Sequence, residues 1–233
     1  MMAAVRKGSA SVHCDSSLDV MARCGLTTSR WLTKAENREM QSWRDAARRT
    51  SWLAARWLAK RALIDECALP VRLEQIEILS RDRAGRSVRP RVRVDGQAWQ
   101  GSLSISHSRD QVLVVVAQQE KLRVGCDLQG YEAVSPGFAD LWFTDAERCT
   151  FPVPSTAERM LELWAAKEAY YKAFHHGEAF RPRQWQINWD DGRYECYYGK
   201  IRMPGWCELT WRNCGQHKFV IAVCAAECSD EFP

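Results

Sequence analysis

The sequence predicts an α+β fold made of two similar halves, each with helices packed on a small antiparallel sheet. Three matches between the halves, which occur in the same order in each, support this prediction. Residues 31–37 (WLTKAEN) resemble 142–148 (WFTDAER), and Ala54-Ala55-Arg56 resembles Ala165-Ala166-Lys167, both at an offset of 111 residues. Residues 112–120 (VLVVVAQQE) resemble 219–227 (FVIAVCAAE) at an offset of 107. Because ordered self-similarity indicates a repeated supersecondary unit, we divide the chain into a loose lead-in (1–20), an N-terminal half (21–123) and a C-terminal half (124–233).

Within each half, helices are expected first and strands after them. Thr33 and Thr144 each precede a Glu by three residues, which is the pattern of a helix capping box. Helices are predicted over 34–47, 49–66, 145–150 and 156–176, the last opening at Ser155 and stopping at Gly177. Apolar and alternating runs predict strands over 71–80, 91–94, 101–106, 111–118, 121–128, 184–190, 193–201, 206–212 and 218–226. Asp95-Gly96 and Asp191-Gly192 indicate tight turns, and residues 228–233 are expected to form a tail.

The composition is that of a globular protein. Apolar residues make up 46% of the 233 and charged residues 27%, which excludes disordered, collagen-like and coiled-coil classes. No apolar run approaches the roughly 18–20 residues of a membrane span, and the N-terminus lacks the apolar core of a signal peptide. The ten cysteines include no C-x-x-C pair. We therefore expect a cytoplasmic protein with free, mostly buried thiols.

Charge is divided unequally between the halves. Residues 1–123 hold 22 Lys/Arg against 13 Asp/Glu, whereas residues 124–233 hold 11 against 16. A polyanion facing the first half, with carboxylate chemistry in the second, would fit this division. The alternatives are a solvated basic helix face and, because of the Arg-rich stretches and 11 Trp, a nucleic-acid-binding protein.

Two segments of the second half carry candidate chemistry. The strand 122–128 is apolar around one carboxylate, Asp127, which is costly to bury unless it is paired or binds a cation. On the long helix, Trp164, Glu168 and Lys172 are four residues apart and share one face. Taken on spacing alone, Glu168 and Lys172 favour an ordinary exposed ion pair.

Together these segments resemble a known family. Gly125-x-Asp127, followed about 40 residues later by Trp164-x-x-Lys167-Glu168-Ala169-x-x-Lys172, resembles the two signature motifs of 4′-phosphopantetheinyl transferases. The length, duplication and motif order are similar to the monomeric surfactin synthetase activator (Sfp) type. This resemblance implies transfer of 4′-phosphopantetheine from coenzyme A to a serine of an acyl or peptidyl carrier protein, with release of 3′,5′-ADP. It also implies a monomer with an internal pseudo-twofold axis, and no nucleic-acid or membrane partner.

The resemblance further implies a role for each matching residue. Asp127 and Glu168 would hold Mg²⁺, Glu168 would also take the proton of the serine, and Lys172 and Lys167 would stabilise phosphates. Lys34 and Arg38 would grip the 3′-phosphate of coenzyme A. The other positions that match nucleotide contacts are Arg49, Thr50, Arg86, Ser106 and His107.

One position departs from the family pattern. Many members have Gly-x-Asp-x-Glu, whereas this chain has Gln129 in place of the Glu. Residues two apart on a strand share a face, so Gln129 would offer the metal a neutral amide oxygen, and Cys126 would point away into the core. The function expected is therefore an active transferase; the alternative is a weak paralogue that binds coenzyme A or a carrier protein. The pathway served, whether fatty-acid, polyketide or nonribosomal-peptide synthesis, is left open, and residues 138–151 are the candidate carrier-docking segment.

Overall fold

The computed structural model describes residues 5–7, 10–25, 30–82, 84–132, 134–135, 137–150, 156–175, 177–190, 193–214 and 217–227. The N-terminal half comprises β1 (Val5–Lys7), β2 (Ala10–Ser16), α1 (Ser17–Cys24), α2 (Lys34–Gln41), α3 (Ala46–Glu66), the 3-10 turn η2 (Leu73–Gln75), β3 (Ile76–Arg81), β4 (Ser87–Val94), β5 (Gln97–Ala98), β6 (Ser102–Ser108) and β7 (Gln111–Ala117). The C-terminal half comprises β8 (Leu122–Gly130), α4 (Phe138–Trp142), α5 (Asp145–Cys149), α6 (Ala157–Phe174), the 3-10 turn η3 (Pro182–Gln184), β9 (Trp185–Asp190), β10 (Arg193–Tyr198), β11 (Ile201–Arg202), β12 (Trp206–Cys214) and β13 (His217–Glu227).

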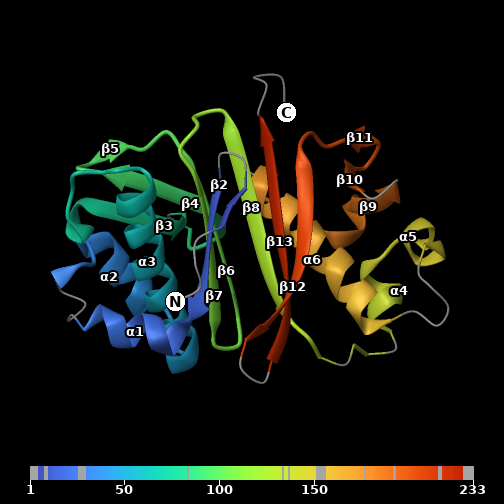
Figure 1. Ribbon diagram of the computed structural model, residues 1–233, viewed down its shortest axis with the longest axis horizontal. Helices are drawn as coiled ribbons and strands as arrows, with labels where there is room; N and C mark the ends of the chain where they lie inside the picture. The colour runs from blue at the N-terminus through green and yellow to red at the C-terminus, as the bar shows by residue number, and fades with distance from the viewer. Residues whose placement is uncertain are drawn as a thin grey trace.

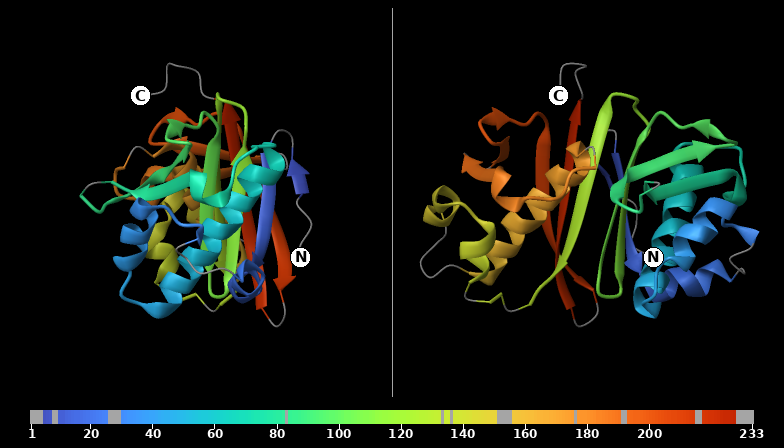
Figure 2. Two further views of the ribbon diagram at one scale, coloured as in Figure 1. Left: turned by 90° about the vertical axis from the view of Figure 1, so that its left-hand side faces the viewer. Right: turned by 180° about the vertical axis from the view of Figure 1, so that it is seen from behind.

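The fold is α+β, as the sequence predicts. All sheets are antiparallel, with strand orders β1-β2-β7-β6, β3-β4-β5, β12-β13-β8 and β11-β10-β9. The longest strands stand side by side in the centre, with α3 on the outside of one half and α6 on the outside of the other (Figure 1). Seen from behind, the two halves have the same plan, each with one long helix against its central strands (Figure 2).

Two of the predicted elements differ from the structure in instructive ways. The helix predicted over 34–47 ends at Gln41, because the Asp45 side chain accepts the Arg48 amide and caps a second helix, α3. The long helix is capped by Thr156, whose hydroxyl accepts the Arg159 amide, and ends at Phe174. Ser155, the Asp191-Gly192 turn and the 228–233 tail lie outside the described residues. The Asp95-Gly96 turn is confirmed: both residues have positive φ, at 49° and 76°, between β4 and β5.

The expectation of a loose lead-in over residues 1–20 is wrong. Strand β2 pairs with β7 along its whole length, and α1 follows it directly. The reason is an alternation that the Ser and Ala content obscured: Ala10, Val12 and Cys14 are buried on one face of β2. The core between the halves therefore depends on this segment.

Alternate residues of two strands divide the core into layers. On β7, Val112, Val114 and Val116 pack against the helices of the N-terminal half. The intervening residues of β7 face a central cluster with β2, β8 and β13. Strand β13 repeats this arrangement, with one side on α6 and the other in the central cluster. Because that cluster holds apolar side chains from both halves, the halves form one packed unit.

A ladder of serine hydroxyls joins β6 of one half to β8 of the other. Ser102, Ser104, Ser106 and Ser108 accept the amides of residues 124, 126, 128 and 130, at 2.9–3.3 Å and always 22 positions apart. The constant offset means that the two strands run parallel. The hydroxyls thus satisfy buried β8 amides that would otherwise lack an acceptor, and they fix the register between the halves.

The duplication extends to a buried ion-pair clamp in each half. Lys60 Nζ contacts Glu36 Oε2 at 2.7 Å and the carbonyls of Trp31 and Leu73. Lys167 Nζ contacts Glu147 Oε2 at 2.7 Å and the carbonyls of Trp142 and Pro182. In each half the same Glu closes the capping box and accepts a strand amide, that of Ile78 or of Ile187.

The clamps correct one of the sequence matches. By contact, the equivalent of Lys167 is Lys60 and not Arg56, which is one helical turn earlier. A shift of four residues keeps the same helix face, so the sequence match could not resolve it. It follows that Lys167 is a structural residue of its half.

We expect Lys60→Met and Lys167→Met to be about equally destabilising. Each leaves one buried carboxylate without its cation, which typically costs about 3–5 kcal/mol. Both lysine side chains are fully buried, so the comparison is matched. Urea unfolding measures the effect, with the exposed Lys121→Met as control. A Lys167→Met protein of normal stability that had lost activity would contradict the structural assignment.

Gly125 allows α6 to lie directly on β8. A Cβ built on Gly125 would be 1.9 Å from the Ala169 carbonyl oxygen and 2.6 Å from the Ala173 amide nitrogen. Both obstructing atoms are backbone, so the helix cannot yield locally. The glycine of the Gly-x-Asp motif therefore sets the distance between the strand that carries Asp127 and the helix that carries Glu168.

Gly125→Ala should cost several kcal/mol or prevent folding, because it overpacks a helix–strand contact. The matched control is Gly137→Ala, at the start of α4, where an added Cβ meets nothing within 4 Å. Soluble yield and thermal unfolding report both variants. If Gly125→Ala were as stable as Gly137→Ala, the close approach would not constrain this fold.

No helix in the described part of the chain has the length and apolar character needed to cross a membrane. The nine described cysteines are free thiols, as the sequence predicts, and most of them are buried. Cys126 is fully buried in the central cluster, which confirms its expected packing role.

Candidate functional site

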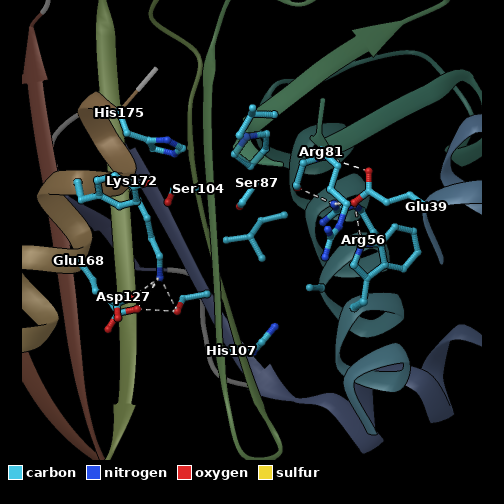
Figure 3. A pocket seen from close by; sticks show the side chains of 18 of the residues that line it. Glu39, Arg56, Arg81, Ser87, Ser104, His107, Asp127, Glu168, Lys172 and His175 are labelled. Atoms are coloured by element: carbon cyan, nitrogen blue, oxygen red, sulfur yellow. Dashed lines mark hydrogen bonds and ion pairs between the residues drawn. The ribbon is translucent and has the colours of Figure 1, made fainter. Parts of the chain in front are cut away.

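A cavity of about 440 Å³ lies between the two halves. One wall is formed by β8 and α6 of the C-terminal half, and the other by α3 and strands β3, β4 and β6 of the N-terminal half (Figure 3). Of the predicted site residues, six line it: Ser106, His107, Asp127, Gln129, Glu168 and Lys172. Residues from the two signature motifs therefore meet in one space.

Asp127 is the centre of the C-terminal wall. It is 1% exposed, and its Oδ1 accepts Lys172 Nζ at 2.5 Å and the Ser106 hydroxyl at 2.9 Å. Its Oδ2 accepts the Gln129 amide at 2.7 Å, as expected for residues that share a strand face. Lys172 also lies 3.3 Å from Glu168 Oε2. The Glu168–Lys172 pair is thus part of a partly buried cluster around Asp127 and not an isolated surface ion pair.

The cluster shifts the protonation of its members. Burial raises the pKa of Glu168 to about 7, with a further contribution from the Asp127 carboxylate, while Lys172 opposes the rise. Burial would lower the pKa of Lys172, but Asp127 and Glu168 outweigh it and raise the pKa overall. Near neutral pH, Glu168 is therefore poised to accept or release a proton while Lys172 stays charged.

The donor set fits a hard divalent cation such as Mg²⁺. Two carboxylates close enough to repel each other, Asp127 and Glu168, offer oxygen ligands, and rotation of the Gln129 amide would present a third oxygen. The described residues contain no cluster of three or more His, Cys, Asp or Glu side chains that could hold a metal. At a site with two acidic ligands, Mg²⁺ would retain several waters.

The N-terminal wall carries two arginines that sequence reasoning did not select. Arg56 is buried and bonds Glu39 Oε1 at 3.0 Å, so its charge is neutralised, and its guanidinium stacks over Trp52. Arg81 stacks over Trp43 at 4.4 Å from the ring centre and donates to the Gly85 carbonyl. Arg81 therefore brings positive charge to the cavity. Its place in the basic run 81–93 was visible in the sequence, but its direction was not.

His107 lies at one end of the cavity. Burial lowers the pKa of its imidazole, and the charges of Lys172 and Arg48 lower it further. Arg48, at the start of α3, is thus an electrostatic neighbour of His107, whereas the sequence pointed to Arg49. A cationic end of this kind suits a phosphate group.

Six predicted residues do not line the cavity. Lys34, Arg38 and Arg49 are exposed at the surface of α2 and α3. The Thr50 hydroxyl donates to the Ala46 carbonyl within its own helix. Arg86 folds back onto Asp82 at 2.7 Å, because the Asp82–Arg86 turn closes on itself. Lys167 is enclosed in its clamp and does not line the cavity, so its expected role in stabilising phosphates stays a prediction without support from this geometry.

The raised pKa of Glu168 predicts a pH-dependent stability. Between pH 4.5 and about 7 the folded state binds more protons than the unfolded state, so stability falls as pH rises through this window. In Glu168→Gln, the amide can donate to Asp127 as the protonated carboxyl does. The variant therefore avoids the free-energy cost of ionising the Glu168 carboxyl in the folded state. In metal-free buffer the variant should gain about 1–3 kcal/mol over the wild type between pH 5 and pH 8.

Urea unfolding at several pH values, with Glu158→Gln on the exposed side of α6 as control, measures this difference. A Glu168→Gln protein whose stability follows the wild-type pH curve would show that Glu168 is not perturbed.

Comparison with known family models gives a match to the segment that holds the C-terminal wall of the cavity. Residues 123–224 match the model of the 4′-phosphopantetheinyl transferase superfamily (ACPS), and this segment includes Asp127, Gln129, Glu168 and Lys172. A search of curated proteins gives no match to the chain.

Two solved structures resemble part of the chain. One is a holo-(acyl-carrier-protein) synthase from Bacillus anthracis str. Ames in complex with CoA (3′,5′-ADP), 21% identical, with a TM-score of 0.37 over 48% of this chain and 96% of that one. The other is an apo-ACPS from Chronobacterium ammoiniagenes, 21% identical, with a TM-score of 0.30 over 46% of this chain and 98% of that one.

Proposed function

We propose that this protein transfers the 4′-phosphopantetheine group of coenzyme A to a serine hydroxyl of an apo carrier protein and releases 3′,5′-ADP. The observation that carries the proposal is the meeting of Asp127, Glu168 and Lys172 in one buried cluster that lines a cavity. These residues belong to both signature motifs and lie in the segment that matches the family model. The cavity also presents Arg81 and His107, which suits a substrate with several phosphates.

Glu168, Lys172 and Asp127 have different roles in the proposed reaction. Glu168, with a pKa of about 7, accepts the proton of the serine hydroxyl at a carboxylate oxygen. The serine oxygen then bonds to the phosphorus that carries pantetheine, while the bond from that phosphorus to the bridging oxygen of 3′,5′-ADP breaks. Lys172, held at 2.5 Å from Asp127, places a positive charge beside the departing phosphate. Asp127 and Glu168 would hold Mg²⁺, which neutralises charge on the pyrophosphate when bound.

Carrier recognition is assigned to the C-terminal half. Helix α4 lies in the predicted docking segment, and Leu141 is 63% exposed and Trp142 37% exposed. Lys34, Arg38, Arg49, Thr50 and Arg86 stay proposed nucleotide contacts, although none of them lines the cavity and Arg86 would have to leave Asp82. Ser106 and His107 are proposed contacts that do line it. The protein is proposed to act as a cytoplasmic monomer on acyl or peptidyl carriers.

One observation favours the second candidate, a weak paralogue that binds coenzyme A without efficient transfer. Gln129 replaces a carboxylate and donates its amide to Asp127, so the metal site has fewer negative charges. Such a protein would bind coenzyme A yet leave carrier proteins unmodified. A nucleic-acid function has less support, because several N-terminal arginines are neutralised by Glu39, Asp65 and Asp82.

The decisive experiment incubates the protein with coenzyme A, Mg²⁺ and a panel of apo carrier proteins. Mass spectrometry should show a gain equal to one phosphopantetheine group on a carrier serine. Glu168→Gln should lower the rate by at least the roughly 10²–10⁴-fold typical of losing a general base, whereas Glu158→Gln on the same helix should match the wild type.

Binding of coenzyme A without modification of any carrier would favour the weak paralogue. Near-normal transfer by a folded Glu168→Gln protein would overturn the catalytic assignment.

A further inference from the structure

The two ends of the cavity differ in chemical character. At one end His107 lies near the charges of Lys172 and Arg48. The other end is reached along α6, where His175 follows Lys172 by three residues, close to one turn. At about 1.5 Å per residue, His175 lies about 10 Å beyond Glu168 along the helix. Figure 3 shows His107 and His175 at opposite ends, with Lys172 between them.

His175 is a buried residue with a fixed ring. It is 5% exposed and ends α6, where its amide donates to the Tyr171 carbonyl. Its imidazole stacks on Tyr171 with ring centres 4.4 Å apart and planes 20° apart. Tyr171 in turn donates its hydroxyl to the Glu178 carbonyl and packs edge-on against Trp185. One face of the imidazole is therefore covered by a ring that is itself held in place.

The opposite wall at this end is formed by β4 and by Arg81 of β3, which pairs with Ser87. Strand β4 contributes Val88 and Pro90 to the cavity lining, together with the small residue Ser87. The ring of His175 is directed from the end of α6 toward this strand (Figure 3). A Cβ on Gly177 would lie 3.7 Å from Val88 Cγ1, so the chain after α6 approaches β4 and narrows this end. The cavity at this end is thus lined by a flat ring on one side and by Val88 and Pro90, with Arg81 beside them, on the other.

We infer that His175 is a specificity-determining residue that stacks on the nucleobase of the coenzyme A donor. The inference rests on the proposed function. A planar base needs an aromatic face and apolar neighbours, which the stack of Tyr171 and His175 opposite Val88 and Pro90 supplies. No motif in the sequence pointed to this role, because His175 lies three residues outside the second signature motif.

Two other roles for His175 fit less well. A phosphate is better placed at the end of the cavity near His107, where Lys172 and Arg48 supply charge. A part in proton transfer would require contact with the reacting groups, yet His175 is two helical turns from Glu168. A contact remote from the reacting bond contributes mostly uniform binding, which appears in KM and not in kcat.

The test uses the fluorescent 1,N6-etheno analogue of coenzyme A, whose emission reports stacking of the base, and it needs no carrier protein. His175→Ala should raise the Kd of this probe about five- to tenfold, the low end for one aromatic–base stack, and relieve part of its quenching. His175→Phe should restore both the affinity for the probe and the quenching of its emission. The matched control is His217→Ala on β13, an exposed histidine that contacts Arg109.

Transfer kinetics complete the test. For His175→Ala, kcat at saturating coenzyme A should stay within about twofold of wild type. The preference for coenzyme A over dephospho-coenzyme A should also be unchanged, since the 3′-phosphate lies elsewhere.

Three results would each overturn the inference. His175→Ala could lose the preference for coenzyme A over dephospho-coenzyme A, it could lower kcat without changing the Kd of the probe, or it could bind the probe as tightly as the wild type does. If the wild type binds the probe but modifies no carrier, the proposed function fails while the stacking contact is still judged by the binding data.

Discussion

The hydroxyl ladder between β6 and β8 is the contact on which the arrangement of this protein depends. Two adjacent sheets with parallel neighbouring edges would ordinarily merge through backbone hydrogen bonds. Here the serines of β6 supply the acceptors, so the strands stay far enough apart for side chains to lie between them. Ser106 shows the consequence most directly, because its hydroxyl accepts the Leu128 amide and donates to Asp127. The same contact that joins the halves therefore orients a residue at the centre of the cavity.

The charges of the C-terminal wall are compensated within that half, with one hydroxyl, that of Ser106, contributed by the other half. Asp127 is almost fully buried, and its stability there depends on Lys172, Ser106 and Gln129 together. Glu168 belongs to the same cluster, where burial and the neighbouring Asp127 raise its pKa. A buried cluster with two carboxylates and one lysine is short of positive charge once Glu168 ionises. This shortage is the physical basis for a cation or a proton in the site, and it explains why such residues suit phosphate chemistry.

The internal repeat serves structure in one respect and function in another. Lys60 and Lys167 hold equivalent clamps, each tying a capping box to the long helix and to a strand. These clamps position α3 and α6 symmetrically on the outside of the central strands. The halves then diverge at the cavity, where β8 and α6 present acidic groups and the N-terminal half presents Arg81 and His107. The repeated clamps thus give the two halves the same framework, and different residues at the cavity make its two walls chemically unlike.

The sequence by itself determined the α+β class, the repeated halves and the capping boxes, because periodicity and cap chemistry are local properties. The association of Asp127 with the Glu168–Lys172 helix face was implied only by the family resemblance. The sequence could not locate β2, whose alternation of small residues becomes significant only when β2 pairs with β7. Nor could it separate Lys167 from the residues that line the cavity. Lys167 points into its clamp, whereas Glu168, the next residue of the helix, points into the cavity. Arg86 was turned away from the cavity by Asp82, four residues earlier, whereas Arg81 was placed at the cavity by Trp43, far away in the chain. Only the tertiary structure decides such contacts, because burial and charge compensation arise from residues that are not neighbours in sequence.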